Sequence, residues 1–362
     1  MEKVLIAMSG GVDSSVSALL VKQAGLDAIG VTLSLQKNCR EELFPGEKTC
    51  CSVDDVNDAR RVCARLGLPF YVFNFQDDFQ AHVIDPFVSA YQNGQTPNPC
   101  IDCNKHIKFG KLLRRAQEIG CTAVATGHYA RVEQDKATGR YLLKTGLDPQ
   151  KDQSYMLYSL TQEQLSRVRF PLGSLTKGEV RQLAEENGLI NAHKRDSQDI
   201  CFVPDGDYAR FIEEYTHASF PPGDFVSPTG QVYGRHKGII HYTIGQRKGL
   251  GISFPQPMYV TKIDPLSRQV TLAPHEALFA RTVTAHTVNL IAAASLPAPV
   301  RAQVKLRYRH APQPATVQQT GPDQLTVVFD EPQRAPTPGQ ALVAYDGDIV
   351  IGGGIIGKEG NP

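Results

Sequence analysis

The sequence has 362 residues, of which 41% are hydrophobic and 21% are charged. This length allows two or three domains, and the composition excludes a disordered chain. The 38 Lys and Arg residues are balanced by 37 Asp and Glu, which excludes the strongly basic surface typical of many nucleic-acid-binding proteins. Any contact with RNA would therefore depend on local basic patches.

Membrane association and export are not expected for this chain. No run of about 18 apolar residues appears, and residues 1–11 lead directly into a predicted strand without a secretory signal. We therefore expect a cytoplasmic location, where a permanent disulfide framework among the eight cysteines is not expected. Cys63 and Cys121 have apolar neighbours and are predicted to be core thiols. No role is assigned to Cys39, Cys50 and Cys51.

The first 200 residues alternate between strand and helix patterns. Strands are predicted at residues 4–8, 28–35, 70–75 and 123–126. Helices are predicted at residues 16–23, 54–66 and 107–118, with a further helix ending at 183–187. This alternation predicts an α/β domain with a doubly wound parallel sheet. Residues 131–144, with Thr138 and Gly139 in the middle, predict a hairpin.

The pattern changes after about residue 205, where Pro and Gly become dense and helical signals rare. Short alternating segments with turn signals begin at about residue 281 and predict a β-barrel. We therefore predict three domains: an ATP-binding catalytic domain at 1–205, a central β-rich domain at 206–280 and a C-terminal β-barrel at 281–362.

The segment SGGVDSS at residues 9–15 lies between the first predicted strand and helix. Two glycines allow close approach of the backbone to phosphate, and the helix N-terminus favours an anion. Asp13 is a candidate ligand for Mg²⁺ on the polyphosphate. A Walker ending is missing, and the loop instead resembles the pyrophosphatase loop of N-type ATP pyrophosphatases. That resemblance implies adenylylation of a substrate but does not identify the substrate.

A pair of cysteines, Cys100 and Cys103, lies in a proline-rich segment that we predict to be a loop before a basic helix. A thiol at a helix N-terminus beside Lys105 and Lys108 is expected to have a depressed pKa. Taken alone, the pair is equally compatible with zinc binding and with redox chemistry.

Four segments together carry a closer resemblance. They are SGGVDSS (9–15), NPCIDCN (98–104), ATGHYAR (125–131) and SQDICF (197–202), and their order and rough spacing resemble those of the tRNA-specific 2-thiouridylases. The resemblance implies ATP-dependent replacement of the 2-oxygen of the wobble uridine by sulfur, through an adenylylated intermediate. It implies that Cys103 is the nucleophile and that Cys201 carries a persulfide, which leaves a Cys103–Cys201 disulfide to be reduced.

The same resemblance implies partners and further site residues. The partners are the tRNAs for Lys, Glu and Gln and a sulfur donor, either a cysteine desulfurase or a sulfur carrier. The ATP-binding residues are Ala7, Met8, Ser9, Gly10, Gly11, Val12, Asp13, Ser14, Leu33 and Gly127. The tRNA-binding residues are His128, Lys151, Asp152, Gln153, Arg307, Tyr308 and Gln340, and the target base is expected to contact Asn98, Pro99 and Cys100.

Alternatives remain for several of these residues. Leu33 is equally compatible with a core position, His128 with a satisfied turn histidine, and Arg307 and Tyr308 with the solvated face of a strand. Some members of the family have Asp where this chain has Cys100. Three thiols at 100, 103 and 201 could instead hold a [4Fe-4S] cluster with one iron open to sulfide.

Two other function classes are compatible with part of the sequence. The first is another ATP-pyrophosphatase-type synthetase, although no glutaminase domain with an N-terminal cysteine accompanies the loop. The second is a metal-bearing RNA-binding protein without turnover, which would leave the ATP loop without a role.

Overall fold

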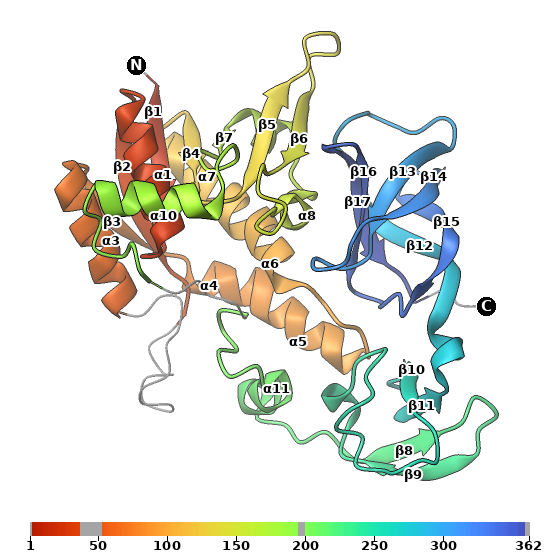
Figure 1. The fold of residues 1–362 in the computed structure, drawn as a ribbon. Coiled ribbons are helices and arrows are strands. Elements are labelled where there is room, and N and C mark those ends of the chain that lie inside the picture. The colour runs from red at the N-terminus through yellow and green to blue at the C-terminus, as the bar shows by residue number, and fades with distance from the viewer. Residues whose placement is uncertain (1, 37–52, 195–199, 359–362) are drawn as a thin grey trace. The chain divides into compact units, whose positions relative to one another are not determined.

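The computed structural model describes residues 2–36, 53–194 and 200–358. The sequence predictions for Cys39, Cys50, Cys51 and residues 197–199 therefore lie outside the described residues. The chain divides into two compact units. The first unit takes in residues 1–84, 100–206 and 348–350, and the second takes in residues 85–99, 207–347 and 351–362. Figure 1 shows the elements of both.

A parallel sheet forms the centre of the first unit. Its strands are β1 (Lys3–Ala7), β2 (Asp27–Ser34), β3 (Phe70–Asn74), β4 (Ala123–Ala125) and β7 (Val168–Arg169), in the order β3-β2-β1-β4-β7. All four neighbouring pairs are parallel, which confirms the predicted doubly wound sheet. The strand order reverses at β1, between β2 and β4. In sheets of this kind, ligands bind in the crevice beyond the carboxyl ends of the strands at that point.

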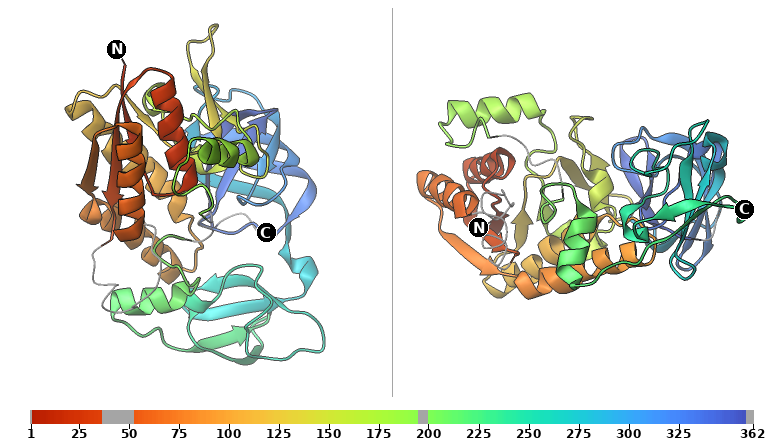
Figure 2. Two further views of the ribbon diagram at one scale, coloured as in Figure 1. Left: turned by 60° about the vertical axis from the view of Figure 1, so that its left-hand side comes forward. Right: turned by 90° about the horizontal axis from the view of Figure 1, so that it is seen from below.

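Three helices cover one face of this sheet: α1 (Val12–Gln23), α3 (Val53–Leu66) and α10 (Lys177–Glu186). Helix α10 lies beside α1 in the views of Figure 2. Alternate residues of β1, Val4 and Ile6, belong to the core under these helices, while Leu5 between them is equally buried and points to the other face. Burial of both faces explains why β1 is a continuous apolar run.

The two predicted core thiols are buried. Cys63 of α3 is inaccessible to solvent, and its sulfur occupies the space that a Cβ on Gly30 would need. Burial raises the pKa of Cys63 to about 11 and also raises the pKa of Cys121. Both residues therefore remain protonated packing groups, as predicted.

The segment that contains the cysteine pair is helical, and the prediction of a loop before a helix at residue 107 is wrong. Helix α6 (Pro99–Asp102) continues into the π-helix η2 (Cys103–Lys111) and then into α7 (Leu112–Glu118). The wide π-helical turns do not follow the 3.6-residue period on which the prediction rested. Cys103 therefore lies within the helical stretch and not at its N-terminus.

Several other helices were not predicted from the sequence. They are α4 (Gln76–Phe79), the π-helix η1 (Gln80–Ile84), α5 (Asp85–Gln92), α8 (Ser154–Leu157), α9 (Gln162–Ser166) and α11 (Tyr208–Thr216). In the second unit, α5 and α11 are joined by aromatic contacts. The rings of Tyr91 and Tyr208 stack with centroids 4.6 Å apart. Packing against a distant segment stabilises such short helices more than their own propensity does.

The predicted hairpin is confirmed as β5 (Ala130–Gln134) and β6 (Tyr141–Thr145). Asp348, which belongs to the same unit, accepts ion pairs from Arg131 at 2.8 Å and from Lys144 at 3.2 Å. The hairpin is thus held at its base by charge pairs between residues more than 200 positions apart.

The second unit contains two β structures, in agreement with the predicted β-rich region and barrel. A four-stranded sheet has the order β10-β11-β8-β9, formed by β8 (Gly223–Val226), β9 (Val232–His236), β10 (Tyr259–Asp264) and β11 (Gln269–Ala273). Short 3₁₀-helices lie at Ile239–His241 and His275–Leu278. A barrel of β12 (Phe279–Leu290), β13 (Val300–Lys305), β14 (Gln313–Gly321), β15 (Gln324–Arg334), β16 (Ala341–Asp346) and β17 (Ile349–Ile356) is closed by pairing of β12 with β17.

Within the described ranges, no helix has the length and apolar character needed to cross a membrane.

Candidate active site

The loop that follows β1 is shaped for a close approach to phosphate. Gly10 has φ = +75°, and a Cβ on it would lie 2.4 Å from the carbonyl oxygen of Asp55. The amide of Ser9 donates to Oγ of Ser14 at 3.2 Å, and the Ser14 hydroxyl donates to the carbonyl of Gly11 at 3.0 Å. The first-turn amides of α1 have no partner within the helix and are available to an anion.

Two residues near the end of α10 hold this loop in place. Asn191 donates through Nδ2 to the carbonyl of Gly10 at 3.0 Å, and Nζ of Lys194 donates to the same carbonyl at 3.2 Å. Lys194 also contacts Asp55 at 2.6 Å and Asp58 at 2.7 Å. Desolvation alone would lower the pKa of Lys194, but its hydrogen bonds to these carboxylates raise it. Sequence reasoning missed both residues, because no local motif marks them.

Most of the predicted nucleotide-binding residues lie at the end of β1, in the loop after it and at the start of α1, with Leu33 on β2 and Gly127 after β4. Gly127 follows β4 and faces the first turn of α1, where an added Cβ would lie 2.8 Å from the carbonyl carbon of Asp13. Met8, Val12 and Leu33 are almost completely buried, with 2%, 3% and 8% of their surface exposed. Contact between these three residues and a nucleotide would therefore come from the backbone.

The proposed magnesium ligand already has partners. Lys177 donates to both carboxylate oxygens of Asp13, at 2.7 and 2.9 Å, and the Tyr129 hydroxyl donates at 2.8 Å. No cluster of three His, Cys, Asp or Glu side chains suited to a metal occurs in the part of the chain that the structure describes. Since Mg²⁺ on polyphosphates commonly takes only one or two protein carboxylates, Asp13 fits as a single ligand once Lys177 exchanges partners.

Neither of the two predicted catalytic cysteines forms a disulfide in this structure, and both belong to the first unit. Cys103 is 9% exposed, in the π-helix, whereas Cys201 is half-buried in a turn. Phe202, which follows Cys201, makes an edge-to-face contact with Phe79 of α4 at 5.8 Å, and α4 in turn contacts the π-helix. The segments of both thiols thus pack against one short helix.

The third thiol, that of Cys100, does not have the depressed pKa that the sequence predicts. The Cys100 side chain is exposed, but the desolvation from protein around it raises the pKa of the thiol, against the opposing charge of Lys108. The expected depression of the pKa is therefore wrong for Cys100. Desolvation also raises the pKa of Asp102 to about 6. Cys100, Cys103 and Cys201 are all described, and the three thiols do not form a ready-made ligand group for a single metal ion. The [4Fe-4S] alternative stays a prediction.

His128 is a packed residue. It is 7% exposed, its Nδ1 shares a 2.7 Å hydrogen bond with Thr126, and its ring lies near those of Phe109 and Phe170. Burial lowers the pKa of His128 well below its usual range, so the imidazole is neutral. This packing fits a satisfied turn histidine, and a contact of His128 with tRNA stays a prediction.

The predicted tRNA-binding segment at residues 151–153 is fixed to neighbouring backbone. Asp152 accepts from the amide of Gly146 at 3.0 Å, and Gln153 accepts from the amide of Tyr129 at 3.0 Å. These two side chains shape the loop, and Lys151 beside them is half-buried.

The remaining predicted tRNA residues lie in the second unit, where their polar groups also have protein partners. Gln340 donates to the carbonyls of Thr96 at 2.8 Å and Pro97 at 3.3 Å. Arg307 lies beyond the end of β13, not on a strand face, and donates to the carbonyl of Ala335 at 2.8 Å. Tyr308 stacks with Lys305, whose Nζ lies 5.7 Å from its ring centre. Gln340 therefore supports the segment that leads to Asn98 and Pro99.

A doubly wound parallel sheet with a glycine loop at its switch point defines a class of nucleotide-binding α/β enzymes. Family models assign the chain more closely. Residues 2–205 match the tRNA methyl transferase HUP domain, residues 209–274 the tRNA methyl transferase PRC-barrel domain, and residues 280–356 the aminomethyltransferase beta-barrel domain.

Full-length relatives agree with this assignment. The chain is 51% identical over 358 residues to the tRNA-specific 2-thiouridylase MnmA of Clostridioides difficile (strain 630), covering 99% of each chain. It is 51% identical over 357 residues to the protein of the same name from Geotalea uraniireducens (strain Rf4), covering 98% of this chain and 95% of the relative. The chain belongs to the family of tRNA-specific 2-thiouridylases, the ATP-dependent tRNA-uridine 2-sulfurtransferases.

Proposed function

We propose that this enzyme replaces the 2-oxygen of the wobble uridine with sulfur in the tRNAs for Lys, Glu and Gln, in the cytoplasm. The observation that carries the proposal is the presence, in one compact unit, of a glycine loop at the sheet switch point and of the thiols of Cys103 and Cys201. The sulfur donor is a cysteine desulfurase or a sulfur carrier protein.

Activation of the uracil takes place at the loop after β1. Ser9, Gly10, Gly11 and the first turn of α1 hold the phosphates of ATP, and Gly127 keeps that turn close to β4. The 2-oxygen of the uracil attacks the α-phosphorus, pyrophosphate leaves, and the adenylylated oxygen becomes a good leaving group. Mg²⁺ supplies charge neutralisation on the polyphosphate, with Asp13 as its protein ligand.

Sulfur transfer then uses the two cysteines in sequence. The terminal sulfur of a Cys201 persulfide attacks C2 of the uracil, and AMP departs with the former 2-oxygen. The Cys103 thiolate attacks Sγ of Cys201, which breaks the sulfur–sulfur bond and leaves the transferred sulfur on the uridine. The resulting Cys103–Cys201 disulfide is reduced by an external dithiol before the next turnover.

Binding of tRNA involves residues of both units. Asn98, Pro99 and Cys100 contact the target base, while Lys151, Arg307 and Tyr308 contact the RNA directly through cations and a stacking ring. The contributions of His128, Asp152, Gln153 and Gln340 are indirect, because their polar side-chain groups hold neighbouring segments of the protein.

The test is nucleoside mass spectrometry on unmodified tRNA-Glu incubated with iron-free protein, ATP, Mg²⁺ and a sulfur donor. We expect 2-thiouridine to form with the wild type, to be lost in Cys201→Ser with tRNA binding retained, and to persist in Cys63→Ser. Product that appears only after anaerobic cluster reconstitution would overturn the persulfide route. Absence of product under both conditions would contradict the substrate assignment.

A further inference from the structure

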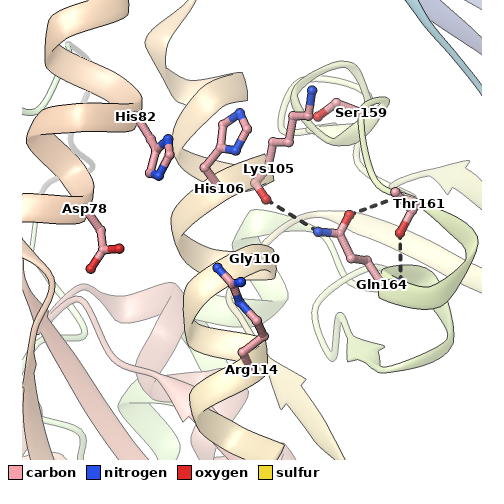
Figure 3. A pocket seen from close by; sticks show the side chains of 9 residues that line it. All are labelled: Asp78, His82, Lys105, His106, Gly110, Arg114, Ser159, Thr161 and Gln164. Atoms are coloured by element: carbon pink, nitrogen blue, oxygen red, sulfur yellow. Dashed lines mark hydrogen bonds between the residues drawn. The ribbon is translucent and has the colours of Figure 1, made fainter.

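A cavity that the proposed chemistry does not use opens in the first unit beside the π-helix η2. Its volume is about 280 Å³. Figure 3 shows its lining, which comes from α4, η1, η2, α7 and the segment around α9. The lining residues are Asp78, His82, Lys105, His106, Gly110, Arg114, Ser159, Thr161 and Gln164.

The charge of this cavity favours an anion. Lys105 and Arg114 line it, and no described carboxylate lies within ion-pair distance of either cation. Asp78 is the acidic residue among the described lining residues, and it is already paired with Lys111 at 3.2 Å. Among the described residues, Arg114 therefore has no carboxylate within ion-pair distance, and Lys105 has only the longer-range attraction of Asp102.

Neutral donors complete the lining. The rings of His82 and His106 stack with centroids 5.2 Å apart, and Figure 3 shows them side by side. Burial, Lys105 and His82 lower the pKa of His106, so its imidazole enters the neutral range as a donor without adding charge. Ser159 is only 7% exposed, and its hydroxyl has no hydrogen-bond partner among the described residues. A buried hydroxyl without a partner is costly, and an anion in the cavity would satisfy it.

The walls of the cavity are held by Gln164, the N3 residue of α9. Its Nε2 donates to the carbonyl of Phe109 at 2.8 Å and to that of Lys105 at 3.4 Å, and its Oε1 accepts from the amide of Thr161 at 2.9 Å. Gly110 leaves room for this arrangement, since a Cβ there would lie 2.9 Å from the carbonyl oxygen of Lys105. Lys105 thus projects from a π-helix that is braced by a side chain of another helix, and Arg114 projects from α7, which continues the π-helix.

We propose that this cavity binds one backbone phosphate of the tRNA substrate. Lys105 and Arg114 supply charge and a planar donor fork, and Ser159 supplies a hydroxyl, a donor set that matches a phosphodiester. Lys105 and Cys103 lie on the same π-helix but, being two residues apart, on different faces of it. A tRNA that reaches this thiol therefore passes close to the helix that carries Lys105. The inference rests on the proposed function in taking the phosphate from tRNA; free phosphate and pyrophosphate share the same chemistry.

The experiment compares tRNA binding by wild type, Lys105→Gln and Arg114→Gln over a salt series without ATP. We expect each variant to bind roughly 3- to 30-fold more weakly, and the slope of log affinity against log salt to become shallower by about 0.7 to 0.9 for the lost phosphate contact. Ser159→Ala should weaken binding without changing the slope. The matched control is Arg61→Gln, an exposed arginine of α3, which should change neither quantity.

A second arm titrates wild type and Arg114→Gln with inorganic phosphate and with pyrophosphate in the absence of tRNA. If a small anion binds in an Arg114-dependent manner while the tRNA salt slope is unchanged, the tRNA assignment is overturned. An unchanged slope with no small-anion binding overturns the anion site itself, although thiolation by the wild type would leave the proposed function intact. Failure of wild type to bind tRNA at all would overturn both.

Discussion

Lys177 is the charged partner of the phosphate loop that the sequence motif does not contain. Its ammonium pairs with Asp13 and is only 12% exposed, so both charges are partly desolvated. Replacement by Met leaves the Asp13 carboxylate without this partner beside the position proposed for the triphosphate. The loss of the ammonium also removes the cation that would lie beside the triphosphate once Mg²⁺ has replaced it on Asp13, so ATP should bind more weakly.

We therefore expect Lys177→Met to raise the KM for ATP in tRNA-dependent pyrophosphate release by about tenfold, equivalent to about 1.4 kcal/mol. The matched control is Lys136→Met, because Lys136 is exposed in the hairpin turn. Equal KM values for the wild type and Lys177→Met would show that this ion pair has no part in nucleotide binding.

Asp102 lies between Cys100 and Cys103 in the sequence, and its carboxyl group makes the stability of the fold depend on pH. Its pKa is raised to about 6 by desolvation, with Lys105 acting in the opposite direction, and the usual value for Asp is about 3.9. The folded state therefore binds more protons than the unfolded state between about pH 4 and 6. The free energy of unfolding contributed by this group falls as the pH rises through that window and stays low above it.

Asp102→Asn should accordingly be more stable than the wild type at pH 7.5, by on the order of 2 kcal/mol, and should lose this advantage near pH 4. Urea unfolding at the two pH values measures the difference. The control is Asp346→Asn, at an exposed position at the end of β16. If Asp102→Asn raised the free energy of unfolding as much at pH 4 as at pH 7.5, the result would contradict a raised pKa at Asp102.

At the scale of the elements, the nucleotide site depends on the close approach of β4 to the N-terminus of α1. A Cβ on Gly127 would lie 2.8 Å from the carbonyl carbon of Asp13 and 2.9 Å from the amide nitrogen of Ser14. Both are backbone atoms and cannot rotate away, so strand and helix must separate. Such overpacking costs about 1–3 kcal/mol.

Gly127→Ala should therefore lower the free energy of unfolding by roughly that amount and weaken ATP binding, measured by thermal unfolding and by calorimetric titration. Gly178→Ala is the matched control. A Cβ on Gly178 would meet only the Thr176 hydroxyl, at 3.9 Å, and helix propensity favours Ala over Gly there. Equal behaviour of the two variants would show that the close contact at Gly127 is not required.

At the scale of the whole molecule, the chain passes from the second unit to the first between Pro99 and Cys100. The segment before this point is held within the second unit, where Gln340 binds the carbonyls of Thr96 and Pro97. The segment that leads to the residues proposed to contact the target base is therefore held by a barrel turn some 240 positions later in the sequence.

Gln340→Ala should raise the KM for tRNA roughly 3- to 10-fold, which is the effect expected when one hydrogen-bonding side chain is lost. The KM for ATP should not change. Steady-state thiolation with each substrate varied in turn separates the two effects. Gln318→Ala, on the exposed part of β14, should change neither value. A change confined to the KM for ATP would oppose this assignment.

Local patterns in the sequence were sufficient for the class of fold, the hairpin, the barrel and the position of the phosphate loop. Strand–helix alternation and glycine at a fixed backbone position are properties of neighbouring residues, and the resemblance supplied the thiols at 103 and 201. The division into domains at residues 205 and 280 stays a prediction.

Tertiary structure alone decided which distant groups meet. Nothing near Asn191, Lys194 or Lys177 in the sequence indicates that they hold the loop at Gly10 and Asp13, because those contacts join residues more than 160 positions apart. Gln164 likewise donates to the carbonyl of Phe109 in the π-helix from 55 positions away. Local sequence patterns do not show such partners, because the energy of each contact depends on a position that only the folded chain defines.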